Sequence, residues 1–236
     1  ISVGQAEVTN GKYRAVGLGT FGWHHLLALR GIHWETEEAV AYADTLYEEI
    51  AWHTIRASAG LAEEKGAFSE FTGSEWHTGE YFERRSYTGE RWDALRRKVA
   101  TSGVRNGWMM AVAPNSSTAK IGGSTDGIDP LYAVEYAEEK KNFRFNVTAP
   151  DLNHRTYDYY RRARHVLDQK WSIRQNAARQ RHIDQSISFN LYVPHTIRAK
   201  ELLELHLEAW KCGLKTSYYV RSTSQEEIEA CEACES

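Results

Sequence analysis

The feature that most constrains the fold is a strand, helix, strand pattern in the last third of the chain. Residues 186–193 are typical of a buried strand, residues 199–212 have the leucine spacing of a helix, and residues 216–220 predict a second strand. Gly213 follows the helix, a common position for a helix-ending glycine. Two strands joined by a crossover helix pair in parallel, so this pattern predicts an α/β fold with a parallel sheet.

The rest of the chain is predicted to be largely helical. Four further segments have the apolar spacing of helices, namely residues 23–29, 37–65, 90–101 and 171–178. Residues 67–86 have no sustained period, which predicts a long ordered connection. Residues 108–113 form a short apolar run that we interpret as a buried strand.

Composition limits the partners that the chain can have. Its 236 residues are 42% apolar and 26% charged, which is typical of a globular protein. The net charge of −3 provides no positive field for a polyanion, so we expect no direct DNA binding. No run approaches the roughly 18 apolar residues of a membrane span, and we expect a cytoplasmic protein with no membrane contact. The chain begins at Ile1 rather than Met, which we interpret as a sign of a longer parent protein.

The last residues differ in character from the rest. We expect residues 1–222 to form the folded part and residues 223–236 to form a mobile acidic tail. The tail contains the pair Cys231 and Cys234. A closed zinc site needs more ligands than this pair offers, and a thioredoxin-like motif opens a helix after a strand. The spacing therefore favours an exposed dithiol that exchanges disulfides with partners.

A loop with three consecutive hydroxyl side chains, called the hydroxyl loop below, follows the apolar run at residues 108–113. Its residues are Pro114, Asn115, Ser116, Ser117 and Thr118. Backbone N–H groups at the start of a helix or turn, together with such hydroxyls, can bind a phosphate without a basic residue. An ordinary helix N-cap with spare hydroxyls fits the same residues, and both interpretations stay open.

Tyr218 and Tyr219 are adjacent near the end of the last predicted strand. In a regular strand one ring would face inward and the other outward. Alternatively, the two phenols could pass an electron and a proton between them, which requires stacked rings and a local break from strand geometry.

Taken in this order, the three sites resemble the catalytic, or alpha, large subunit of class I ribonucleotide reductase of the bacterial and phage type. The supporting segments are GLG at 17–19, TGEYF at 78–82, APNSSTA at 113–119, HIDQSISF at 182–189 and GLKTSYY at 213–219. The resemblance runs through the whole chain but covers only the C-terminal portion of that subunit. It implies the C-terminal half of a ten-stranded α/β barrel, followed by a flexible tail.

The resemblance also implies roles for these residues. The loop at 114–118 would bind the diphosphate of a nucleoside diphosphate substrate. Tyr219 and then Tyr218 would carry an oxidising equivalent from the small, or beta, subunit, which holds the dimetal-oxygen and tyrosyl radical cofactor. Cys231 and Cys234 would re-reduce the active-site disulfide and would be reduced by thioredoxin or glutaredoxin. This chain itself is expected to bind no metal or cofactor.

One part of the family pattern is missing from this chain. The family uses a thiyl radical on an Asn-x-Cys-x-Glu loop and two further cysteines in the barrel, whereas Cys212 lies on a predicted helix, at the wrong place for these roles, and is expected to be a small buried hydrophobe. We therefore expect an N-terminal large-subunit chain to complement this one in reducing ribonucleotides to 2′-deoxyribonucleotides. The alternatives are a non-catalytic chain that docks on a reductase, and a thiol-disulfide oxidoreductase that uses Cys231 and Cys234.

Overall fold

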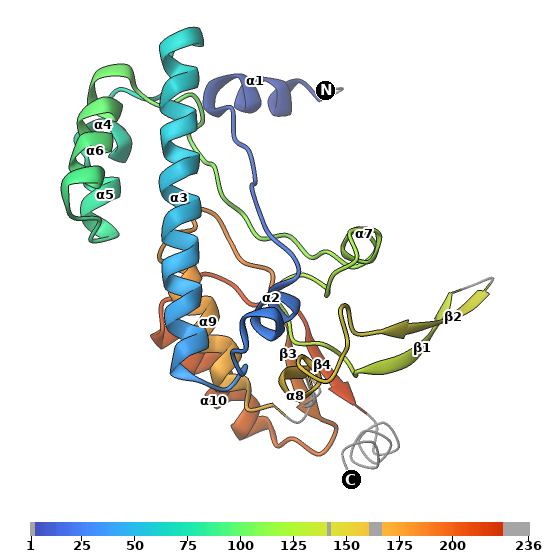
Figure 1. Ribbon diagram of the computed structural model, residues 1–236. Helices are drawn as coiled ribbons and strands as arrows, with labels where there is room; N and C mark the ends of the chain where they lie inside the picture. The colour runs from blue at the N-terminus through green and yellow to red at the C-terminus, as the bar shows by residue number, and fades with distance from the viewer. Residues whose placement is uncertain (1–2, 141–142, 161–166, 224–236) are drawn as a thin grey trace. The chain divides into compact units, whose positions relative to one another are not determined.

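The structure is a computed structural model that describes residues 3–140, 143–160 and 167–223 (Figure 1). The residue contacts divide the chain into two compact units, each made of separate stretches. Unit 1 is drawn from residues 1–18, 44–111 and 181–185, and unit 2 from residues 19–43, 112–180 and 186–236. Cys231 and Cys234 lie outside the described residues, as does the predicted acidic tail from residue 224 onward.

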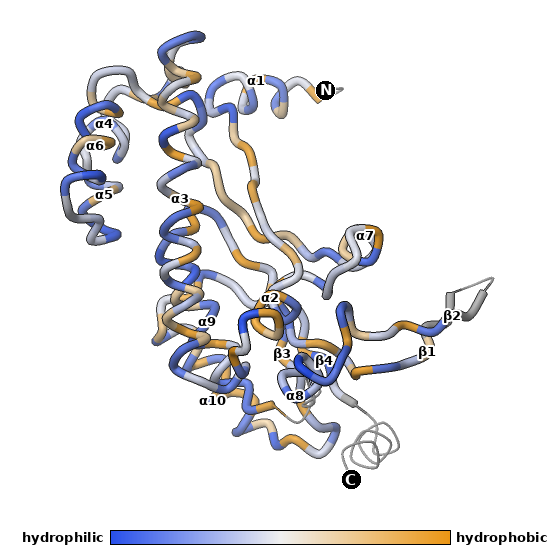
Figure 2. Tube along the Cα trace, in the orientation of Figure 1, coloured by the Kyte–Doolittle hydropathy of each residue, from blue (hydrophilic) through white to orange (hydrophobic). Residues whose placement is uncertain are grey.

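Unit 1 is built from helices. Its helical elements are α1 (Gly4–Tyr13), most of α3 (Glu37–Lys65), α4 (Glu75–Thr78), α5 (Glu80–Arg84) and α6 (Glu90–Ser102). The predicted long helix is confirmed as α3, with two acidic residues in its first turn and Gly66 after it at φ +79°. Figure 2 shows hydrophilic and hydrophobic residues alternating along α3, as an amphipathic helix requires.

The α6 helix packs against the unit 1 part of α3. Indole Nε1 of Trp92 donates to Glu48 Oε1 at 2.8 Å, while Trp92, Leu95 and Val99 are buried as predicted. The segment at 67–86, expected to be a connection, contains the short helices α4 and α5. Ser74 caps α4 by accepting the N–H of His77, so local capping forms helices that are too short for a periodic pattern to reveal.

Unit 2 combines helices with two small sheets. Its elements are α2 (Trp23–Arg30), α7 (Ser117–Ile121), β1 (Glu135–Lys140), β2 (Phe143–Thr148), α8 (Tyr157–Tyr160), α9 (Gln169–Gln180), β3 (Leu191–Pro194), α10 (Ala199–Lys211) and β4 (Val220–Thr223). Strands β1 and β2 form an antiparallel hairpin that the sequence analysis did not predict. Strands β3 and β4 are parallel, with α10 between them, so the predicted strand, helix, strand unit is confirmed. Both strands begin later than predicted.

The predicted strand at residues 108–113 is wrong as a continuous element. Unit 1 contains an isolated parallel bridge between Leu18 and Met110, and unit 2 one between Val112 and Ile187. The N–H groups of Met109 and Met110 donate to the carboxylate of Asp184, at 2.8 and 2.9 Å. A side chain thus occupies backbone donors that a longer ladder would use.

The sheets of the described residues remain open, and none closes into a barrel. Among the helices in the described ranges, none is both long enough and apolar enough to cross a bilayer.

Candidate functional site

A pocket of about 760 Å³ lies within unit 2. Its lining comes from the residues before α7, the residues 123–132 after it, the hairpin β1–β2, and the segments that contain Asn190 and Tyr218. A volume of this size suits a small organic ligand. The pocket therefore brings together two of the three sites that the sequence predicted, the hydroxyl loop and the tyrosine pair.

The hydroxyl loop contributes its first residues to this pocket. Pro114, Asn115 and Ser116 line it, whereas Ser117 and Thr118 are exposed at the start of α7. The predicted turn into a helix is confirmed, because Ser116 is the N-cap of α7 and its hydroxyl makes no capping hydrogen bond. Two cations that the sequence analysis did not assign to a site, Lys120 and Arg221, also line the pocket.

Tyr218 and Tyr219 lie on the same side of the chain rather than on opposite faces. Their ring centroids are 4.0 Å apart and their planes are inclined at 50°. The rings are therefore in contact but tilted, so the expected face-to-face stacking is wrong. A hydrogen bond with Tyr219 raises the pKa of the Tyr218 phenol. The two residues are 46% and 50% exposed, and Tyr218 lines the pocket.

The backbone explains why the two rings do not alternate. The carbonyl of Phe189 accepts the N–H of Tyr218, and the N–H of Leu191 donates to the carbonyl of Tyr219, both at 2.9 Å. In a regular parallel ladder the carbonyl of Phe189 and the N–H of Leu191 would both bond to one residue of the opposite segment. Here two residues lie opposite Asn190, which is the pattern of a β-bulge. The bulge is the break from strand geometry that allows two adjacent tyrosine rings to be in contact. It also explains why β4 begins only at Val220.

Asn190 belongs to a polar network beside the tyrosine pair. Asp129 accepts the Asn190 backbone N–H at 3.2 Å and the Tyr192 hydroxyl at 3.0 Å, and its carboxylate also accepts the Asn190 side-chain amide. Asp129, Asn190 and Tyr192 all line the pocket. These residues were not predicted from the sequence, although polar residues within apolar runs such as Ile128-Asp129-Pro130 and Phe189-Asn190-Leu191 are a usable signal.

Helix α2 anchors the loop that forms the pocket wall after α7. The His25 ring bonds to Ser124 Oγ through Nδ1 and to Asp151 Oδ2 through Nε2, both at 2.9 Å. The buried His24 accepts the Leu131 N–H at Nδ1. Burial lowers the pKa of His24 to about 4, so this ring is a neutral acceptor at physiological pH. The role of this histidine pair was not predicted from the sequence.

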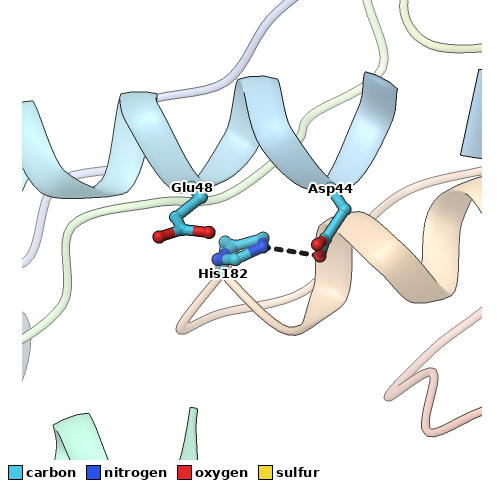
Figure 3. Close-up of side chains that lie close together, drawn as sticks. All are labelled: Asp44, Glu48 and His182. Atoms are coloured by element: carbon cyan, nitrogen blue, oxygen red, sulfur yellow. Dashed lines mark hydrogen bonds and ion pairs between the residues drawn. The ribbon is translucent and has the colours of Figure 1, made fainter. Parts of the chain in front are cut away.

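Unit 1 contains a second group of titratable side chains, Asp44, Glu48 and His182 (Figure 3). Their potential metal-ligand atoms lie within 4.8 Å of one another. However, Nε2 of His182 bonds to Asp44 at 2.9 Å and Nδ1 to the Tyr87 hydroxyl at 2.9 Å. Burial lowers the pKa of His182 and raises that of Tyr87, which favours a neutral ring with Tyr87 as donor. The arrangement is that of a structural hydrogen-bond network.

Cys212 is half-buried rather than fully buried as expected. Its thiol donates to Glu208 Oε1 at 3.7 Å, and burial together with that carboxylate raises the pKa of the thiol. A raised pKa disfavours the reactive thiolate. This cysteine therefore has the environment of a structural residue.

Comparison with known proteins assigns the family. Residues 1–220 match the family described as ribonucleotide reductase, barrel domain. The chain is 49% identical to the ribonucleoside-diphosphate reductase subunit alpha of Treponema pallidum, over 98% of this chain and 27% of that relative. It is 37% identical to the corresponding subunit of Helicobacter pylori strain J99, over 93% of this chain and 30% of the relative.

The chain thus belongs to the ribonucleotide reductase barrel domain family, a family of oxidoreductases in deoxyribonucleotide biosynthesis. The open, mixed helix and strand architecture is consistent with part of such a barrel. The chain spans less than a third of the length of these two relatives.

Proposed function

We propose that this chain is the C-terminal segment of the large subunit of a class I ribonucleoside-diphosphate reductase. It would act with an N-terminal chain that supplies the thiyl-radical cysteine and the inner cysteine pair. The observation that carries the proposal is the shared pocket, where the loop at 114–116 and the Tyr218 ring line one cavity. Reduction of a ribonucleotide needs a diphosphate site and a radical source at the same place, and this pocket supplies residues for both.

The substrate in this proposal is a nucleoside diphosphate. Asn115 and Ser116 offer an amide and a hydroxyl to the phosphate oxygens, and Ser117 and Thr118 offer further hydroxyls at the start of α7. Arg221 in the lining adds positive charge, which strengthens phosphate binding. These residues bind and orient the diphosphate, leaving the ribose to the complementing chain.

The tyrosine pair transfers the oxidising equivalent in this proposal. The Tyr219 phenoxyl radical takes one electron and one proton and becomes a phenol, while Tyr218 loses one of each and becomes the phenoxyl radical. Contact between the rings and the hydrogen bond between the hydroxyls support this step, because the electron and the proton both travel a short path. A small subunit and its cofactor would supply the oxidising equivalent to Tyr219, and Tyr218 would pass it toward a cysteine of the complementing chain.

The terminal cysteines complete the cycle. Each turnover oxidises two active-site thiols to a disulfide, and Cys231 and Cys234 would reduce it by giving up two electrons and two protons. The resulting disulfide would be reduced in turn by thioredoxin or glutaredoxin. We place this chemistry in the cytoplasm, where thiol reductants keep such pairs reduced.

Reconstitution tests the proposal. The chain is mixed with an N-terminal large-subunit chain and a small subunit, and deoxynucleotide formation from a ribonucleoside diphosphate is measured. We expect turnover with the unmodified chain and with Tyr157→Phe, an exposed tyrosine outside the pocket lining, and none with Tyr219→Phe. Assembly without turnover would instead support a non-catalytic docking chain. Insulin-disulfide reduction by the isolated chain, abolished in Cys231→Ser, would support the oxidoreductase alternative.

A further inference from the structure

The bulge at Tyr218 and Tyr219 leaves one backbone donor outside the β-ladder. The N–H of Tyr218 donates to the carbonyl of Phe189, and the carbonyl of Tyr219 accepts the N–H of Leu191. The N–H of Tyr219 donates to the side-chain oxygen Oδ1 of Asn190 at 3.3 Å. A side chain on the opposing strand thus satisfies the donor that the extra residue creates.

The orientation of the Asn190 amide is fixed by its other partner. Asn190 is 8% exposed, and its Nδ2 donates to the carboxylate of Asp129. A carboxylate only accepts hydrogen bonds, so Asp129 must face the NH₂ group and the amide oxygen must face Tyr219. The backbone N–H of Asn190 donates to the same carboxylate, which ties the side chain and the backbone of Asn190 to one anchor.

We propose that Asn190 is a positioning residue that maintains the bulge and thereby keeps the Tyr218 and Tyr219 rings in contact. Without its amide oxygen, the Tyr219 N–H loses its acceptor, and the segment gains by returning to a regular ladder. Successive side chains of a regular strand point to opposite faces, so the two phenols would separate. This inference concerns the geometry of the pair, and its catalytic consequence rests on the proposed function.

The consequence for radical transfer follows from the distances. Passing a hydrogen atom equivalent between phenols requires hydroxyls within hydrogen-bond reach, and small displacements of reacting groups cost large factors in rate. Loss of Asn190 should therefore lower kcat in the reconstituted complex. It should change the KM for the diphosphate less than kcat, because the hydrogen bonds of Asn190 described above go to Asp129 and Tyr219 and not to residues 114–118.

A reciprocal exchange provides a sharp test of the network. Asn190→Asp alone places two carboxylates against each other, and Asp129→Asn alone leaves an amide NH₂ group without an acceptor. In the double variant Asp129→Asn with Asn190→Asp, the new carboxylate accepts the Tyr219 N–H and the new amide donates to it. The donor and acceptor pattern at the Tyr219 N–H and between positions 129 and 190 is thereby restored, whereas the Tyr192 hydroxyl now faces an NH₂ group and must turn to accept from it. Asn153→Ala is the matched control, because Asn153 is exposed and, among the residues that the structure describes, its side chain bonds within its own turn.

The geometry of the pair is read independently of turnover with 3-fluorotyrosine at position 218. The ¹⁹F signal of the whole chain is titrated with pH in the unmodified chain and in the variants other than Asn190→Asp. We expect the pKa of this phenol to fall toward that of free fluorotyrosine in Asn190→Ala. Asn190→Asp is read by turnover only, because its added carboxylate would itself raise the pKa of a nearby phenol. In the double variant, where the total charge is unchanged, we expect the pKa to match that of the unmodified chain. Tyr219→Phe should mimic the loss, and Asn153→Ala should match the unmodified chain. An unchanged titration in Asn190→Ala would overturn the proposal.

Turnover separates the two proposals. With an active complex, we expect kcat to fall about tenfold or more in both Asn190 single variants and to recover in the double variant. A changed ¹⁹F titration in Asn190→Ala together with an unchanged kcat would overturn the inference that ring contact is needed for turnover. A low kcat in a double variant whose titration has recovered would show that the Asp129 carboxylate itself is needed, against a purely positioning role for Asn190. If the unmodified chain yields no turnover, the proposed function fails, while the ¹⁹F data still decide whether Asn190 positions the pair.

Discussion

The ring nitrogen Nδ1 of His24 accepts the backbone N–H of Leu131 at 2.9 Å, which joins helix α2 to the loop that lines the pocket. The other nitrogen, Nε2, therefore carries the ring proton and donates it to the carbonyl of Tyr159 at 3.0 Å. His24 is 1% exposed, so charging it would cost desolvation and would also replace its acceptor with a donor.

The free energy of unfolding should decrease with acidification because of His24. Burial lowers its pKa from 6.5 to about 4 in the folded chain, so between these values the unfolded chain binds more protons. The contribution of the neutral ring to the free energy of unfolding is fully present above pH 6.5, declines as the pH falls, and is lost below about pH 4. The shift corresponds to on the order of 3 kcal/mol.

Urea unfolding at several pH values between 4 and 7 measures this effect. His24→Asn is the informative variant, because it keeps an acceptor for the Leu131 N–H but does not titrate. We expect a shallower pH dependence in the variant than in the unmodified chain. Parallel curves for the two proteins would show that His24 does not contribute.

Replacement of Gly22 should destabilise unit 2 by more than backbone strain. Gly22 has φ +81°, and a β carbon there would collide with Ser124 Oγ. Gly123→Ala is the matched control, because Gly123 also has a positive φ, +66°, but has open space around its Cα. We expect Gly22→Ala to cost about 1–2 kcal/mol more than Gly123→Ala, measured by urea unfolding. Adding Ser124→Ala should recover part of the excess, and equal costs for the two glycine variants would contradict the collision.

Asp184→Asn should destabilise unit 1. The two carboxylate oxygens accept the N–H groups of Met109 and Met110, and an amide would turn one of those acceptors into a donor. Leaving one buried N–H without a partner should lower the free energy of unfolding by about 1–3 kcal/mol. Asp93→Asn, an exposed change in the first turn of α6, should cost much less. Similar midpoints in urea for both variants would argue against the role of Asp184.

Ser117→Ala tests the diphosphate loop in a reconstituted reductase. Ser117 is exposed at the first position of α7, so the fold should hardly change. Loss of one hydrogen bond to a charged phosphate should raise KM about tenfold while kcat changes little. Ser102→Ala is the comparison, since that hydroxyl bonds to the carbonyls of Lys98 and Gly103. Unchanged KM would remove Ser117 from the substrate site.

The periodic elements could be predicted from the sequence because their signals are local. The long helix to Gly66, the helix that ends at Gly103 and the strand, helix, strand unit around α10 follow from apolar spacing and glycine positions. The loop at 114–118 could also be predicted as the start of a helix. The roles of the loop and of the tyrosines came from resemblance and remain predictions.

The hairpin β1–β2 and the pocket network were not predicted, because neither has a periodic apolar signature. Asp129 and Asn190 are distant in sequence, and only the fold brings the carboxylate to the amide. Likewise, Asp184 takes the donors of Met109 and Met110 and shortens a strand that local hydrophobicity favours.

The sequence by itself determined the parallel pairing of β3 and β4 in unit 2, because two strands joined by a crossover helix pair in parallel. It also determined the family through the motifs from residue 17 to residue 219. Tertiary structure alone decided that Tyr218 and Tyr219 lie on one side of the chain. That outcome depends on the hydrogen bonds that the two tyrosines make with Phe189, Asn190 and Leu191. Pairing between segments that are distant in sequence sets this register, and local sequence patterns do not specify it.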